Sequence, residues 1–157
     1  MIQRASPHPI AAGLILMIGA LTGCGDDPLT IEGLAGEYIM IAAEGQALPA
    51  VVQTSDTLDI HVTGGNLLLL PNAQYSFTVD YRLIDPRMPG NPTTEGFIDV
   101  GPWEIANDRL LFQSTTPGRI WIGTVDGSRV SIGISEPDFL EKPIEIEFRR
   151  EAAVDGS

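Results

Sequence analysis

The sequence predicts an all-β domain, an up-and-down barrel of about eight antiparallel strands, and three observations support this. From Leu34 onward, short segments alternate apolar and polar side chains, which is the period of a strand with one buried face. Turn-forming residues are frequent, with 17 glycines and 12 prolines, and long helical patterns are missing after the N-terminal apolar run. A meander removes its two open edges by closing into a barrel, although a two-sheet β-sandwich stays the alternative.

The strands are predicted from this alternation in chain order. The clearest segment has Tyr75, Phe77, Val79, Tyr81 and Leu83 on one face and polar residues on the other. The short gaps 107–108 and 126–128 are predicted hairpin turns. The predicted strands cover 36–41, 57–62, 75–83, 101–106, 109–113, 119–125, 129–134 and 144–149.

Three irregular segments connect these strands. The segment 84–93 contains three prolines and a glycine, so we expect the longest loop there. The segments 43–55 and 136–143 are expected to be irregular links, with short helical turns allowed. The pair Gly64-Gly65 is interpreted as a turn at a strand end.

The N-terminal residues have the three parts of a secretory signal peptide. Met1–Arg4 is a short, positively charged start, Ile10–Leu21 is apolar, and small residues follow. The apolar run is shorter than the ~20 residues that a membrane-spanning helix needs. We therefore expect a signal peptide here and not a permanent transmembrane anchor.

The four residues Leu21-Thr22-Gly23-Cys24 resemble the lipobox of bacterial lipoproteins. This resemblance implies that residues 1–23 are removed, that the Cys24 thiol carries a diglyceride, and that the chain is held in a membrane of the bacterial cell envelope. Two acyl chains are enough for stable anchoring. Gly25, in place of the aspartate that retains such proteins in the inner membrane, favours the outer membrane by the same resemblance. Residues 24–33 are then the lipidated cysteine and a tether, 34–150 the barrel and 151–157 a polar tail.

Several motifs of the barrel resemble lipocalin-like domains of bacterial lipoproteins, whose function is uncharacterised. The resemblance implies a small antiparallel barrel and adds no catalytic chemistry. It rests on the segments 34–38, 44–49, 65–70 leading into 72–75, and the closing Phe148-Arg149-Arg150. The proline-rich 85–92 segment and Glu44 depart from the pattern.

Charge and composition exclude several classes of function. The formal net charge is −12, and there is no basic run that could neutralise phosphates, so nucleic-acid binding is disfavoured. One cysteine excludes an internal disulfide. His8 leaves with the signal, and His61 shares a polar strand face with Asp59, too few ligands for a metal site. We assign the acidic side chains Asp99, Glu104, Glu145 and Glu147 to a solvated exterior.

The sequence therefore predicts a protein that is not an enzyme and has no catalytic residues, metal or cofactor. The leading hypothesis is a membrane-anchored barrel that binds a small apolar ligand or a partner protein of the envelope. The alternatives are an interaction module that resembles protease-inhibitor barrels and, less favoured, a hydrolase. An open cavity would favour ligand binding, and a filled core with an exposed 84–93 loop would favour the interaction module. Aromatic side chains could line a cavity, with candidate ligand-binding residues Tyr75, Phe77, Tyr81, Trp103 and Trp121.

Overall fold

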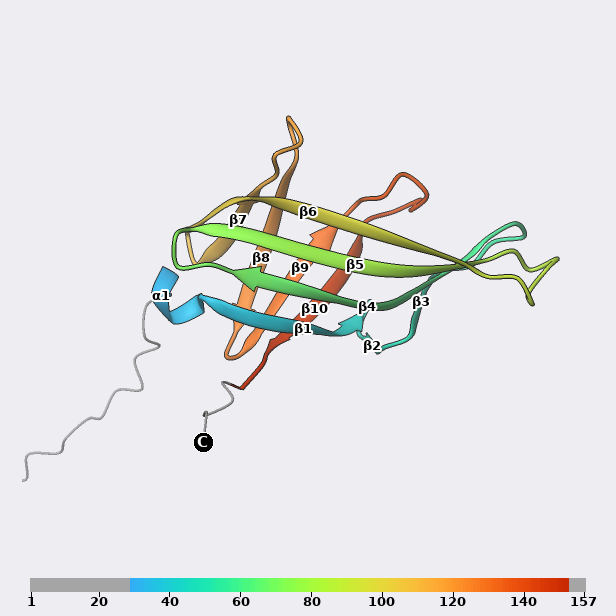
Figure 1. Ribbon diagram of the computed structural model, residues 1–157, viewed down its shortest axis with the longest axis horizontal. Coiled ribbons are helices and arrows are strands. Elements are labelled where there is room, and N and C mark those ends of the chain that lie inside the picture. Colours follow the sequence, from blue (N-terminus) through green and yellow to red (C-terminus); the bar gives the residue numbers. More distant parts are fainter. Residues whose placement is uncertain (1–28, 153–157) are drawn as a thin grey trace, which may run out of the picture.

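The computed structural model describes residues 29–152, which form an antiparallel β-barrel with one short helix (Figure 1). The predicted signal peptide, the lipobox with Cys24 and the end of the polar tail lie outside the described residues. The elements are α1 (Ile31–Leu34), β1 (Gly36–Ala43), β2 (Gln46–Ala47), β3 (Ala50–Gln53), β4 (Asp59–Leu69), β5 (Gln74–Ile84), β6 (Thr93–Ala106), β7 (Arg109–Gln113), β8 (Ile120–Asp126), β9 (Arg129–Ile134) and β10 (Ile144–Arg150).

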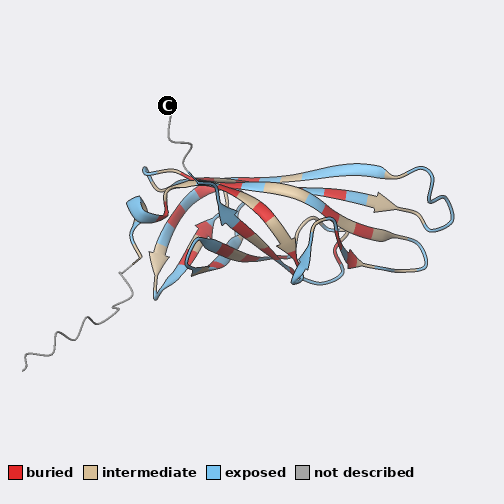
Figure 2. Ribbon diagram, turned by 90° about the horizontal axis from the view of Figure 1, so that it is seen from below, coloured by how far each residue is buried: buried red, intermediate tan, exposed pale blue. Residues whose placement is uncertain are grey.

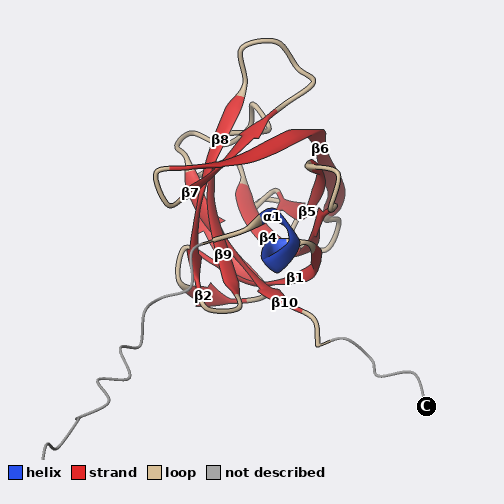
Figure 3. Cartoon of the chain, turned by 90° about the vertical axis from the view of Figure 1, so that its left-hand side faces the viewer, coloured by secondary structure: helices blue, strands red, loops and turns tan. Residues whose placement is uncertain are grey.

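Closure of the sheet decides between the predicted barrel and the alternative sandwich. Strand β1 pairs with β10 on one side and, through its first four residues, with β4 on the other. The strands from β4 to β10 are neighbours in chain order, so eight strands form a closed barrel and β2 and β3 are additions to it. Viewed along the barrel in Figure 3, the strands form a ring. The prediction of an up-and-down barrel is confirmed.

The helix α1 lies at one end of this ring (Figures 1 and 3). Thr30 caps its first turn by accepting a hydrogen bond from the N–H of Gly33, 3.0 Å away. Arg150, in the last strand, donates to the carbonyls of Gly33 and Ala35. The buried Leu34 joins the core. The start and the end of the domain are therefore fastened to each other.

The barrel interior is filled with large apolar side chains. Four of the five predicted inward residues of β5 are buried, and the fifth, Leu83, is half-buried. Alternate apolar residues of β9 and β10 are buried in the same way, and Figure 2 shows this alternation along the strands. Five bulky side chains lie wholly inside, each with 2% or less of its surface exposed: Phe77, Tyr81, Trp103, Phe112 and Phe148. Close packing of this kind leaves little interior volume for a guest.

One predicted turn and one predicted irregular link form strands in the structure. Gly64 and Gly65 lie inside β4, where the register shifts between Val62 and Gly64, and do not form a turn. A Cβ at Gly65 would lie 2.2 Å from the Thr78 carbonyl oxygen, so glycine is needed for a close approach of two strands. The link predicted over 43–55 contains the short strands β2 and β3, which pair with β1 and β4.

The loop between β5 and β6 covers only 85–92, since Ile84 and Thr93 belong to the strands, and the prediction that it is the longest loop is wrong because the 135–143 link is one residue longer. Residues 86–91 are all exposed, and Met88 at the tip keeps 59% of its surface in solvent. The adjoining halves of β4, β5 and β6 extend beyond the barrel (Figures 1 and 2). The 135–143 link packs against this extension, because Phe139 contacts the Tyr81 ring edge-to-face at 5.2 Å and Tyr81 donates to the Glu136 carbonyl.

Candidate binding surface

Strand β6 has a free edge in the barrel wall, and this edge defines the candidate site. On one side, β5 pairs with β6 from Thr93 to Pro102. On the other side, β7 pairs with only its last residues, Trp103–Ala106. The Val100 carbonyl accepts from the N–H of Thr115 on this second side. Along a strand, the backbone N–H and C=O groups of every second residue point to the same side. The backbone groups of Thr94, Gly96 and Ile98 therefore point to this second side, where the described chain supplies no backbone partner.

The outer surface beside this edge is unusually apolar. Ile98 in β6 is 68% exposed, and Ile120 in β8 is 61% exposed. Val100 and Ile122 add further exposed apolar surface on the same two strands. Strands β6 and β8 are separated by β7 in the sheet order, but the ring centres of Phe97 in β6 and Trp121 in β8 lie 6.2 Å apart. Single exposed apolar residues are common on protein surfaces, but several on two strands that approach each other indicate a contact surface. We name Ile98, Val100, Ile120 and Ile122 the apolar wall.

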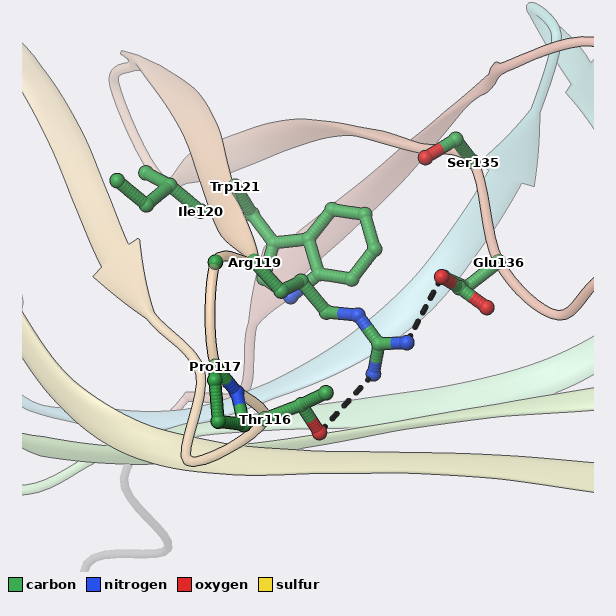
Figure 4. Close-up of a pocket in the computed structure, with 8 residues that line it drawn as sticks. Thr116, Pro117, Arg119, Ile120, Trp121, Ser135 and Glu136 are labelled. Atoms are coloured by element: carbon green, nitrogen blue, oxygen red, sulfur yellow. Dashed lines mark hydrogen bonds and ion pairs between the residues drawn. The ribbon is translucent and has the colours of Figure 1, made fainter.

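The unpaired part of β6 and strand β8 are not joined by a strand ladder, and we call the space between them the gap. The side chain of Arg119 lies in this gap. Its guanidinium lies 5.7 Å from the Phe97 ring centre and 5.6 Å from that of Trp121. It forms an ion pair of 2.7 Å with Glu136 and donates to the Thr116 hydroxyl (Figure 4). Side-chain contacts, and not a strand ladder, therefore seal the barrel here.

An open pocket of about 320 Å³ lies at Arg119. Its lining includes Trp121, Ser135 and Glu136, which Figure 4 shows around the guanidinium. This volume is at the small end of those that hold small molecules. A second pocket of about 280 Å³ lies at the β1–β4 closure beside Tyr38 and Leu67.

A buried carboxylate lies behind Arg119 and joins the elements around the gap. Asp99 is 4% exposed. Its Oδ2 accepts from the Tyr75 hydroxyl at 2.7 Å and from Trp121 Nε1 at 2.5 Å, and its Oδ1 accepts from the Ser114 hydroxyl at 2.5 Å. We name these four residues the Asp99 cluster. It fastens β5, β6, β8 and the β7–β8 loop to one another.

The burial of Asp99 corrects its assignment to a solvated exterior. The exterior assignment treated Asp99 as one acidic residue among many, because no strand was predicted over 93–100. In the structure β6 begins at Thr93, and the alternation that buries Trp103 also points Asp99 inward. The carboxylate is tolerated there because three donors satisfy it. Glu104 and Glu145 are exposed, as expected.

Burial raises the pKa of Tyr75, and the hydrogen bond and charge of Asp99 raise it further, whereas the charge of Arg119 lowers it. Burial also raises the pKa of Tyr81. Both phenols are therefore kept protonated in the folded chain well above pH 10, where tyrosines of an unfolded chain ionise.

We predict that the free energy of unfolding falls as the pH rises above about 10. A raised folded-state pKa gives stability that is present below the unfolded pKa and lost above it, by roughly 1.4 kcal/mol per pH unit for each such tyrosine. Urea unfolding at pH 8 and pH 11 measures the loss. The Tyr75→Phe variant is expected to lose less between these two conditions, and an equal loss in both proteins would contradict the assignment.

The five candidate ligand-binding residues are all buried and point inward. Tyr75, Phe77 and Trp121 lie together, with ring-centre distances of 5.9 Å for Tyr75–Phe77 and 6.0 Å for Phe77–Trp121. Tyr81 packs against Phe139, and Trp103 Nε1 has no partner among the described residues. Of the five, only Trp121 lines either of the two pockets described above. Their role in ligand binding stays a prediction.

Comparison with protein-family models and with curated proteins finds no match for this chain. In the part of the chain that the structure describes, no helix is long and apolar enough to cross a membrane. Within residues 29–152, no three histidine, cysteine or acidic side chains are grouped as metal ligands. His61 and Asp59 lie on the same face of β4, as predicted.

Sequence reasoning did not single out Ser114, Arg119 or Glu136. These residues lie in or beside loops, and only the fold brings them to β6. One signal was available for β6 itself, since Phe97, Asp99, Gly101 and Trp103 have the spacing of one strand face. That face includes the charged Asp99, while the apolar Ile98 and Val100 lie on the opposite face. The rule that apolar side chains point inward therefore does not show which face of this segment is buried.

Proposed function

We propose that this chain is a lipid-anchored, non-enzymatic protein of the bacterial cell envelope that binds a partner protein at the apolar wall. The observation that carries this proposal is the distribution of large apolar side chains. The interior is occupied by the chain's own aromatic residues, whereas Ile98 and Ile120 stand in solvent beside an unpaired strand edge. In such a barrel, the surface that is available for binding a partner lies on the outer face.

The anchor part of the proposal is supported by the sequence. The signal-like residues 1–23 and the lipobox-like Leu21–Cys24 precede the domain and are separated from it by only a short tether. Attachment at Cys24, with a short tether up to α1, would hold the barrel close to the membrane surface, where it can meet another envelope protein. The small-ligand hypothesis is less well supported, because the pocket at Arg119 is small and its guanidinium is already paired with Glu136.

Photo-crosslinking in cells tests the proposed function. The full chain carries a photoreactive phenylalanine analogue at Ile98, at Ile120 or, as a matched control, at Val51, which is an exposed apolar residue of β3. We expect one discrete adduct of the same mass from positions 98 and 120 and none from position 51. Absence of an adduct at both wall positions, or equal adducts at all three, would contradict the proposal.

A further inference from the structure

The free edge of β6 is open to an incoming backbone. Gly96 is exposed, and because glycine has no side chain, this exposure belongs to its backbone. Thr94 and Ile98, which point to the same side, are also exposed. Exposed, unpaired strand edges are templates for strand addition. Five residues, from Thr94 to Ile98, span roughly 17 Å, enough for a short peptide strand.

An acidic side chain can be reached across this edge. Asp80 in β5 pairs with Gly96 and is exposed on the outer face. A Cβ at Gly96 would lie 3.9 Å from Asp80 Oδ1, so the glycine leaves the carboxylate uncovered. The ion pairs of the described chain do not include Asp80. A strand added beside β6 would therefore pair with a backbone that carries no side chain at Gly96, and the Asp80 carboxylate would lie next to Gly96 on the neighbouring strand β5.

Ile98 adds a second requirement on the incoming strand. It lies two residues after Gly96 on the same face and is the most exposed large apolar residue of the wall. Cross-strand contacts with β-branched or aromatic residues stabilise such a position. The residue opposite Ile98 would thus be apolar, and the residue opposite Gly96 would be a lysine or an arginine.

Resting on the proposed function, we propose that the partner adds an extended segment as a strand to the Thr94–Ile98 edge of β6, with a basic side chain opposite Gly96 that pairs with Asp80. A second copy of this chain fits less well. Symmetric pairing about Gly96 would place glycine opposite glycine and leave Asp80 without a cation, and two chains of net charge −12 repel each other.

Hydrogen exchange with a synthetic strand tests this inference on the full chain in detergent. The probe is a nine-residue peptide of alternating valine and threonine with a central lysine, and its companion has a central glutamate. We expect the lysine peptide to slow exchange in the segment 93–99 and to bind roughly two- to five-fold more tightly than the glutamate peptide. Asp80→Asn should remove this difference while keeping the protection.

A second variant tests the backbone contact. Gly96→Pro removes the outward N–H, which β5 does not use, and should abolish protection by both peptides while thermal unfolding stays cooperative. No protection of 93–99 at millimolar lysine peptide, or protection confined to β3, would overturn the inference. Protection that depends on protein concentration without any peptide would identify a second copy instead. Photo-crosslinks at Ile98 without peptide protection would leave the proposed function standing and remove only the strand-addition mode.

Discussion

Replacing Asp99 with alanine lowers the free energy of unfolding by about 3–5 kcal/mol. The change leaves the Tyr75 hydroxyl, the Trp121 N–H and the Ser114 hydroxyl without their common acceptor, and each buried donor without a partner costs about 1–3 kcal/mol. Because a domain of this size is stable by only about 5–15 kcal/mol, this loss is a large fraction of the total. Urea denaturation at neutral pH measures the difference.

Two control variants separate this effect from a general response to substitution in β6. Asp99→Asn keeps one acceptor oxygen and should lose about half as much stability. Glu104→Ala, at an exposed position of the same strand, should change stability by no more than about 0.5 kcal/mol. If Asp99→Ala were no worse than Glu104→Ala, the cluster would have no part in holding the barrel wall together.

Replacing Gly101 with alanine costs about 3 kcal/mol, at the upper end of the range for overpacking. A Cβ at this position would lie 1.9 Å from the backbone oxygen of Gln113, and backbone cannot move aside as a flexible side chain can. The strands β6 and β7 would have to separate where β6 leaves the barrel ladder. Thermal or urea unfolding of the variant measures the cost.

Gly133 in β9 provides the matched control. A Cβ there meets nothing within 4 Å, so Gly133→Ala should be neutral or slightly stabilising, because alanine restricts the unfolded chain. Equal destabilisation by the two glycine replacements would show that strand flexibility, and not the close approach to Gln113, is what Gly101 supplies.

The strand pattern was predictable wherever one face is apolar and the other polar. This holds for Tyr75–Leu83, whose alternation is confirmed in β5, and for the turns at Asn107-Asp108 and Gly127. Both residues of the first turn and Gly127 have positive φ, as tight hairpin turns require. Local sequence alone determines such segments.

The candidate binding surface could not be predicted in the same way. In the first half of β6, the inward face carries Asp99 and the outward face carries Ile98, so the hydrophobic pattern is reversed. The donors that make this reversal tolerable come from Tyr75, Ser114 and Trp121, which are 15 to 24 residues away along the chain. No local pattern contains that information, and the length of the free edge follows only from how little of β6 is paired with β7.

Native mass spectrometry of the full chain, before and after extraction with organic solvent, tests most directly whether the barrel acts from its outside. The filled interior predicts the same protein mass in both samples, since no guest is held among Phe77, Trp103 and Phe112. A mass excess that extraction removes would mean that the core opens around a ligand, and would contradict the account of a barrel that binds through its wall.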